Sequence, residues 1–445
     1  MTPPCGPSVR GCCHSEPVPP NRQRSPGTTD AVILGLAAMV GCGAFFVWAP
    51  AGGVAGPWLP LAVLLAALTA ACTAVSLSDL VAAHPHVRCA LDDTADLLWP
   101  GAKRFVEVAR LLAKVTAGAA AAQVVGAYVL PSGGAVLVVT AVAVTTALSV
   151  VGVRWTTRGA YARLLGTVVV LLVAVGAGLL SPPQTSEPSA LPVAELPPLE
   201  PTAPGPLQVL TAAGLVMFAF AGYGRITALA QAVADPRRTL RRAVLVAVGV
   251  AAALYLLVVA ALLVGLGAER LATEPAPLVA LIDADRSWVL GVVVRTGAAF
   301  AVASILLTVL IEAADAVHEL AACGALPRPL AQTTRTGRRW RADLVVGGAI
   351  LLAVAVTDPV GATAVSACAF LAQGVVVNLA ALRLRPGNRS WSIGTSLTGL
   401  LLSATLAVLL PVQYVLVTAV VLVLGTMFCA TLVTAGRGGM RDEAR

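Results

Sequence analysis

The chain has 445 residues, of which 58% are hydrophobic and 12% are charged, and its mean hydropathy is +0.87. Soluble domains contain about twice that share of charged residues, so the composition excludes an ordinary soluble protein and predicts an all-α integral membrane protein. The formal net charge of +8 does not indicate a nucleic-acid partner, because the basic residues lie in short segments between apolar stretches, where they set the orientation of the chain in the lipid bilayer.

Twelve apolar stretches are predicted to be transmembrane helices, because a membrane helix needs about 20 apolar residues. They cover residues 31–49, 57–80, 105–130, 134–152, 160–180, 207–230, 242–266, 288–312, 343–357, 359–382, 394–410 and 412–434. Residues 1–29 are predicted to form a disordered tail before the first span, and residues 435–445 a second tail after the last.

The basic residues between the spans indicate the orientation. Of the 30 Lys and Arg, four are assigned to the spans themselves (Arg110, Lys114, Arg225 and Arg295) and two to one face of the membrane (Arg270 and Arg286), which leaves 24 on the other face. The positive-inside rule makes that face cytoplasmic. We therefore expect a multi-pass protein of the cytoplasmic membrane with both termini inside.

The longest loop on the outer face covers residues 181–206 and contains nine prolines and no basic residue. Such a composition predicts an extended extracellular connector. It divides the chain into a first group of five spans (30–180), a second group of five (207–383) and two additional helices (394–434).

Two of the predicted spans contain glycine-rich breaks. Gly41-Cys42-Gly43 interrupts the first span, and the segment 218–224, Phe-Ala-Phe-Ala-Gly-Tyr-Gly, interrupts the sixth. Glycine costs about 1 kcal/mol relative to alanine inside a helix, so both spans are predicted to be discontinuous. Unwound backbone at membrane depth must be buried in protein or face a cavity, and a matched pair of such breaks points to the substrate site of a transporter.

A broken helix exposes free N–H groups at one end and free carbonyl groups at the other. A carboxylate suits the first end and an ammonium group the second, so two broken helices could bind a zwitterionic α-amino acid. We expect the amides of residues 42–44 to meet the carboxylate, and the carbonyls of Met39 and those near Phe218 and Ala221 to meet the ammonium. The residues assigned to the site are Met39, Gly41, Cys42, Gly43, Ala44, Phe218, Phe220, Ala221 and Gly222. The alternative is that these glycines only permit close helix packing.

Several segments carry a resemblance to a known family. They are GLAAMVGCGAFFVWAPAGGVAG (35–56), AVSLSDLVAAHP (74–85), VMFAFAGYGRITALAQAVADPRRTLRRAV (216–244), VRTGAA (294–299) and GALP (324–327). In this order they resemble amino acid permeases of the amino acid–polyamine–organocation (APC) superfamily. The resemblance implies a five-plus-five inverted repeat like that of the leucine transporter, alternating access, amino acid substrates and, commonly, proton coupling or exchange.

The chain departs from that family at the predicted cytoplasmic side. Gln231 and Ala232 stand where the family usually has two acidic residues, and Asp315 where it usually has an arginine. These changes motivate an alternative function, a non-transporting sensor or assembly partner that keeps the fold and has a degenerate inner gate.

Charged residues inside the predicted spans are candidates for coupling or gating. Lys114 lies midway along the third span, where a charge costs about 3 kcal/mol on insertion scales. It could occupy an ion site, release a proton or simply extend toward water. Glu312, Asp315 and Glu319 share one helix face and could form an inner gate with Arg225 or with the basic residues of the third span; the alternative is a helix end already in water.

We therefore predict a secondary active transporter for an amino acid or a related amine, with neutral substrates favoured because the two breaks contain no acidic residue. No motif of an enzyme is present, and no spacing indicates a metal site or a cofactor. The sequence leaves the amino acid, the coupling ion and the oligomeric state open.

Overall fold

The computed structural model describes residues 27–83, 98–99, 101–129, 134–153, 157–180, 205–227, 229, 233, 235–274, 276–283, 288–322, 324–334, 337–385, 387, 389 and 391–442. Most of the predicted N-terminal tail, most of the proline-rich connector and the departures at Gln231 and Ala232 lie outside these residues.

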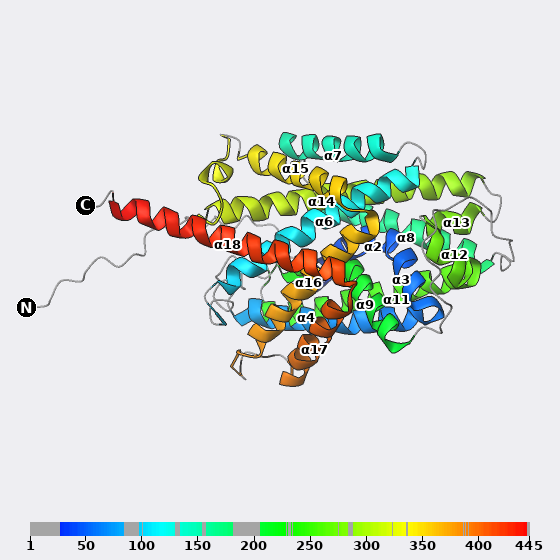
Figure 1. Cartoon of the computed structure of the whole chain (residues 1–445). Coiled ribbons are helices and arrows are strands. Elements are labelled where there is room, and N and C mark those ends of the chain that lie inside the picture. Colours follow the sequence, from blue (N-terminus) through cyan, green and yellow to red (C-terminus); the bar gives the residue numbers. More distant parts are fainter. Residues whose placement is uncertain are drawn as a thin grey trace, which may run out of the picture.

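Every regular element within the described ranges is helical (Figure 1). The α-helices are α1 (Thr28–Met39), α2 (Cys42–Phe46), α3 (Trp48–Ala55), α4 (Leu59–Ala83), α6 (Ala102–Val129), α7 (Gly134–Val151), α8 (Thr157–Leu180), α9 (Pro206–Phe220), α10 (Gly224–Thr227), α11 (Pro236–Gly265), α12 (Gly267–Thr273), α13 (Pro277–Asp283), α14 (Trp288–Ala322), α15 (Trp340–Val356), α16 (Pro359–Ala381), α17 (Ile393–Leu409) and α18 (Val412–Asp442). Two short 3-10 turns, η1 (Gly56–Trp58) and η2 (Arg328–Ala331), complete them.

Helix is present in each of the twelve predicted apolar ranges, and several helices extend beyond them, for example α14, which continues to Ala322. Two of these extensions lie at the chain ends. The first helix begins at Thr28, within the predicted tail, because the Asp30 carboxylate accepts a 3.0 Å hydrogen bond from the Gly27 amide and so stabilises the first turn. The last helix continues to Asp442, beyond the predicted end at residue 434, since the chain contains no proline after Pro411 that would interrupt it.

Eight of the described helical stretches are long and apolar enough to cross a membrane. They are Trp48–Ala83, Ala102–Gly126, Gly159–Leu179, Pro206–Thr227, Arg238–Gly265, Val294–Ala322, Pro359–Ala381 and Val412–Val433. The helices Thr28–Met39, Ala135–Val151 and Ile393–Leu409 are apolar but shorter. The chain is therefore a multi-pass helical membrane protein.

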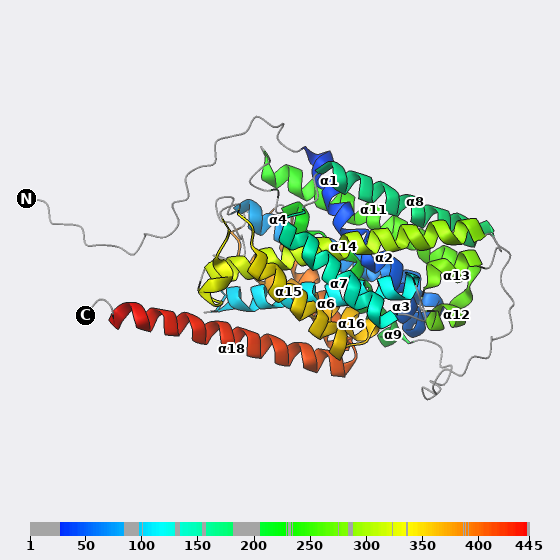
Figure 2. The same cartoon turned by 90° about the horizontal axis from the view of Figure 1, so that it is seen from above.

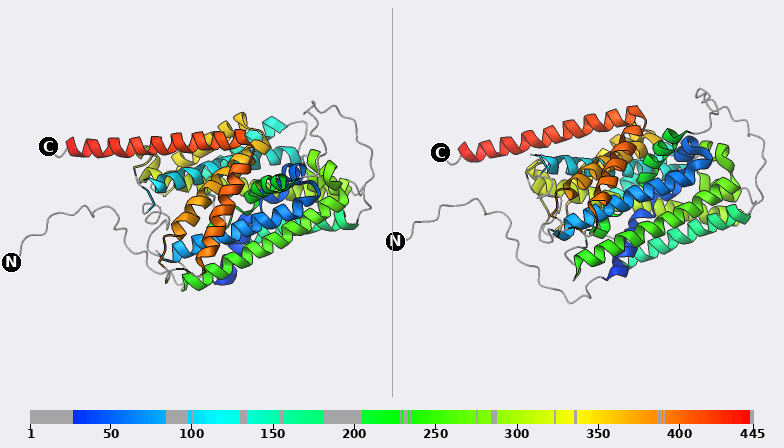
Figure 3. Two further views of the ribbon diagram at one scale, coloured as in Figure 1. Left: turned by 60° about the horizontal axis from the view of Figure 1, so that its bottom comes forward. Right: turned by 90° about the horizontal axis from the view of Figure 1, so that it is seen from below.

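The helices form a bundle with α6 and α16 near its centre (Figures 1 and 2). Helix α6 packs along α14 and α16, while α4 packs against α11 and α9. Figure 3 shows α18 along the outside of the bundle, and only 17% of its membrane-spanning window is buried, against 78% for α16. Helix α16 is thus an interior helix, whereas most of the apolar surface of α18 is exposed on the outside of the bundle.

Several helices start with the residues that local chemistry favours. Pro206, Pro236 and Pro359 occupy the first helical position, where the missing N–H of proline has no partner to lose. Asp235 and Asp358 precede two of these helices, and each carboxylate accepts a hydrogen bond from an amide of the first turn.

Candidate functional site

The first helix is interrupted where the sequence predicts. Helix α1 ends at Met39, and Val40 (φ −75°, ψ 79°) and Gly41 (φ −144°, ψ −139°) leave the helical conformation. The helical course then resumes at Cys42 and continues to Ala55, because the Val47 amide donates to the Gly43 carbonyl and the Ala51 amide to the Val47 carbonyl, each at 3.1 Å. The polypeptide therefore presents a helix C-terminus and a helix N-terminus side by side.

The second interruption lies between α9 and α10. Helix α9 ends at Phe220, residues 221–223 form a turn, and the four residues of α10 follow. The hydrogen bonds here have three-residue spacing: the Ala221 amide donates to Phe218 at 3.3 Å and the Arg225 amide to Gly222 at 3.2 Å. The regular four-residue ladder of the α-helix is therefore lost at this point.

The two interruptions are in direct backbone contact. A Cβ atom at Gly222 would lie 2.4 Å from the carbonyl carbon of Ala38 and from the amide nitrogen of Met39. A Cβ atom at Gly43 would lie 2.5 Å from Cα of Ala219. Only glycine fits at these two positions. In this conformation, close helix packing, which the sequence offered as the alternative interpretation of these glycines, is sufficient to explain why glycine stands at both.

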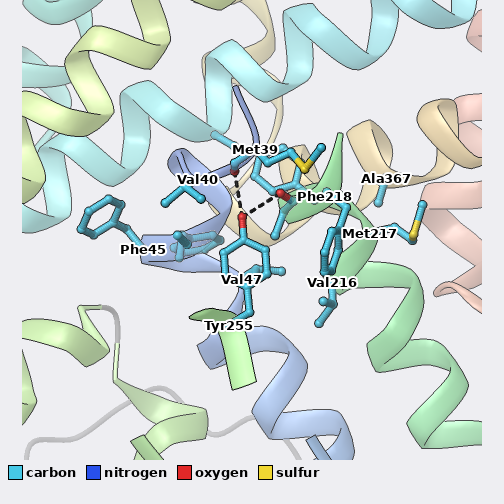
Figure 4. Close-up of a cluster of buried hydrophobic side chains, with 14 of the residues drawn as sticks. Met39, Val40, Phe45, Val47, Val216, Met217, Phe218, Tyr255 and Ala367 are labelled. Atoms are coloured by element: carbon cyan, nitrogen blue, oxygen red, sulfur yellow. Dashed lines mark hydrogen bonds between the residues drawn. The ribbon is translucent and has the colours of Figure 1, made fainter. Parts of the chain in front are cut away.

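Tyr255 of α11 connects the two interruptions (Figure 4). Its hydroxyl oxygen lies 2.8 Å from the Met39 carbonyl oxygen and 2.9 Å from that of Ala219. Both carbonyls belong to the last residues of an interrupted helix, where the usual amide partner is missing. Tyr255 is completely buried, and its ring makes edge-on contacts with Trp48 and Phe220 at centroid distances of 5.3 and 5.1 Å.

Tyr255 was not among the predicted site residues. The available signal was a phenolic hydroxyl in the middle of the predicted span 242–266, because such a group needs a hydrogen-bond partner when it is buried.

The other predicted site residues lie around the same contact. The side chains of Phe218 and Phe220 are buried, and that of Ala221 is partly buried. The Ala44 amide, predicted to meet a carboxylate, already donates to the Gly41 carbonyl at 2.9 Å. The amides of residues 42 and 43 are the first two of the resumed helix, where no carbonyl of that helix can reach them.

A charged triad, Lys114, Arg225 and Glu312, lies next to the second interruption. Lys114 of α6 binds one carboxylate oxygen of Glu312 on α14, and Arg225 of α10 binds the other. The side chains of the triad are between 21% and 36% exposed. The structure thus brings together three of the residues predicted as candidates for an inner gate.

The other two acidic residues of that helix face have separate partners. Glu319 lies 3.6 Å from Arg110, which also binds Glu107 of its own helix at 2.5 Å. Asp315 pairs with Arg339, which precedes α15. The acidic residues of the predicted helix face therefore form ion pairs with different basic residues, and Asp315 does not belong to the triad.

Arg163 is a buried cation that the sequence analysis counted among the basic residues outside the spans. It lies on α8 with 5% of its surface exposed. Its guanidinium donates to the Ala37 carbonyl at 3.0 Å, to the Thr308 hydroxyl at 2.5 Å and to the Ser304 carbonyl at 3.5 Å. The count of basic residues was wrong here because Arg163 lies inside the predicted span 160–180, and this position was the missed signal.

Metal-binding side chains do not gather anywhere in the described ranges, where no group of three or more His, Cys, Asp and Glu is close enough to hold an ion. At the contact of the interrupted helices, backbone dipoles meet the hydroxyl of Tyr255.

Comparison with known proteins gives a consistent result. The family model described as "Amino acid permease" matches residues 105–436. Similar proteins include an uncharacterized transporter of Mycobacterium bovis and uncharacterized transporters of two Mycobacterium tuberculosis strains. Each is 34% identical over 423 residues, which covers 92% of this chain and 91% of the relative.

Proposed function

This chain belongs to the amino acid permease family, as the resemblance of its sequence predicted, and from this we propose that it is a secondary active transporter of an α-amino acid or a related amine. We place it in the cytoplasmic membrane with both termini inside, in accordance with the distribution of its basic residues.

The observation that carries this proposal is the contact between the two interrupted helices. In it, two helix C-termini direct the carbonyls of Met39 and Ala219 at one point, the hydroxyl of Tyr255. The start of the resumed helix at Cys42 lies in the same region, since Gly43 touches Ala219. Partial charges of both signs are thus close together without an ionised side chain.

Such an arrangement suits a zwitterion. We propose that the substrate carboxylate binds the amides of Cys42 and Gly43, and that its ammonium binds the carbonyls of Met39 and of the segment from Phe218 to Ala221. Gly41, Ala44, Phe220 and Gly222 complete the site. The surrounding side chains are apolar, which favours a neutral substrate over a cationic one.

The architecture we propose is that implied by the family: twelve transmembrane helices, of which the first ten form two inverted repeats of five, with the first and sixth discontinuous. Substrate would cross by alternating access, coupled to protons or by exchange. Helices in all twelve predicted ranges and interruptions in the first and sixth support this arrangement.

Within this scheme the charged triad forms the inner gate. Glu312 links α10, the short segment after the second interruption, to α6 through Lys114. Release of Arg225 from Glu312 would free α10 from that link and permit movement next to the substrate site.

Binding can be tested first. A ligand that binds only the folded protein raises its apparent melting temperature, so the purified protein should be screened by thermal shift against the common amino acids. We expect at least one neutral amino acid to raise the melting temperature. Uptake of that amino acid into proteoliposomes then separates a transporter from the alternative, a non-transporting sensor or assembly partner, which would bind without flux.

The site itself is tested by Gly222→Ala. The added Cβ would overlap the backbone of α1, so the two interruptions must separate and uptake should fall at least tenfold. Gly249→Ala on α11 is the matched control, because nothing lies within 4 Å of its Cβ position. Equal uptake by the two variants would exclude the contact as the substrate site.

A further inference from the structure

We propose that the hydroxyl of Tyr255 substitutes for the substrate ammonium in the empty transporter, and that it is needed for the empty transporter to return across the membrane. This inference rests on the proposed function. It assigns a positioning role to a residue outside the two interrupted helices.

The number of hydrogen-bond donors at the two carbonyls supports the idea that the hydroxyl takes the place of the ammonium. The carbonyls of Met39 and Ala219 have lost their helical amide partners, and the single hydroxyl of Tyr255 lies within 3 Å of both. A hydroxyl has only one hydrogen to donate, so it can satisfy one of these carbonyls at a time or share its hydrogen between them. An ammonium group has three hydrogens and would satisfy both. The hydroxyl and the ammonium therefore compete for the same two oxygens.

The surroundings make the hydroxyl important when no ammonium is bound. Trp48, Phe220 and Tyr255 are completely buried, and the rings of Trp48 and Phe220 both pack against the ring whose hydroxyl meets these two carbonyls. A carbonyl that is buried among aromatic rings without a donor is strongly disfavoured. Substrate would supply the donors in the loaded transporter, whereas among the described residues the hydroxyl of Tyr255 is the side-chain donor to these two carbonyls.

Measurements of net uptake and of exchange distinguish the transporter without bound substrate from the transporter with it. Net uptake into empty vesicles requires the transporter to return without substrate, whereas exchange keeps it loaded in both directions. Tyr255→Phe removes the hydroxyl and retains the ring that packs on Trp48 and Phe220. We expect it to lower net uptake selectively.

The experiment uses the full-length protein in proteoliposomes and a radiolabelled mixture of the common L-amino acids as the probe. Vesicles are either empty or preloaded with the same unlabelled mixture. For Tyr255→Phe we expect label entry into empty vesicles to fall about tenfold, which corresponds to a barrier about 1.4 kcal/mol higher. Exchange should fall less than about twofold, and its retention shows that the variant is folded.

Tyr128→Phe is the matched control. Tyr128 is also buried, and its hydroxyl donates to the Phe45 carbonyl at 2.7 Å, but the helical course continues past Phe45 to Ala55, so this carbonyl is not at an interruption. We expect this variant to change net uptake and exchange by the same factor.

Two results would overturn the inference and are distinguishable. If the wild type transports and Tyr255→Phe changes net uptake and exchange equally, only the role of Tyr255 is wrong. If the wild type takes up no label in either kind of vesicle, the proposed transport function fails and the inference fails with it.

Discussion

The guanidinium of Arg163 donates a 3.0 Å hydrogen bond to the carbonyl oxygen of Ala37, two residues before the end of α1. This contact joins α8 to the helix that ends at the first interruption, and the bond from Arg163 to Thr308 extends the connection to α14. A single buried cation thus fixes the end of α1 against two neighbouring helices.

We predict that Arg163→Met destabilises the protein. The Ala37 carbonyl loses a charged donor, so the free energy of unfolding should fall by about 1–3 kcal/mol. Arg163→Lys should recover part of this loss, because it keeps a positively charged donor. The recovery should be incomplete, because an ammonium lacks the planar fork with which the guanidinium binds several acceptors at once. Thermal unfolding of the detergent-solubilised protein measures the effect. Arg238→Met, at an exposed position of α11, is the control, and an equal loss in both variants would contradict the prediction.

The charged triad leads to a second prediction. Glu312→Gln leaves Lys114 and Arg225 without their shared anion, so uptake should fall at least tenfold and the apparent melting temperature should also fall. Glu319→Gln is the matched control on the same helix, because its carboxylate is 54% exposed and 3.6 Å from Arg110. Exposed pairs of that kind contribute about 0–1 kcal/mol, so this variant should change uptake less than twofold. Similar uptake by the two variants would contradict the proposal that the triad acts as a gate.

The pair of Asp315 and Arg339 permits a charge-swap test. Its side chains are 35% and 18% exposed, so the pair should contribute no more than about 1 kcal/mol. Asp315→Arg alone places two like charges together and should lower both stability and uptake. The combination of Asp315→Arg with Arg339→Asp restores opposite charges and should recover most of both. Failure of the swap to recover either quantity would show that Asp315 acts through a different group.

A buried polar cluster predicts coupling between α4 and α16. Asn378 is completely buried, and its amide donates to the Thr73 hydroxyl at 3.0 Å and to the Gly374 carbonyl at 2.9 Å. Hydrogen bonds between membrane helices contribute about 0.6 kcal/mol on average and up to about 1.7 kcal/mol.

We expect the double-mutant cycle of Asn378→Leu and Thr73→Val, followed by thermal unfolding, to give a coupling energy in that range. Thr140→Val replaces Thr73→Val in the control cycle, because Thr140 is exposed and bonds only its own helix at Val136. A coupling energy near zero in the first cycle would contradict the contact.

Local properties of the sequence were sufficient to predict the helices and their interruptions. Apolar runs of about 20 residues depend only on composition along the chain, and each of the twelve ranges contains helix among its described residues. The breaks at Gly41 and near Gly222 were also predictable, since the helix propensity of glycine is a property of single residues. The same patterns indicated the family.

Only the tertiary structure determined which groups meet. Tyr255 contacts carbonyls 216 and 36 residues earlier in the chain, and Arg163 contacts a carbonyl 126 residues earlier. These contacts depend on how helices pack and on which backbone groups lose their partners at the interruptions, and no local pattern contains that information. The sequence by itself determined where the backbone must leave the helix. The packing of α8 and α11 against those points decided which side chains donate hydrogen bonds to the backbone carbonyls there.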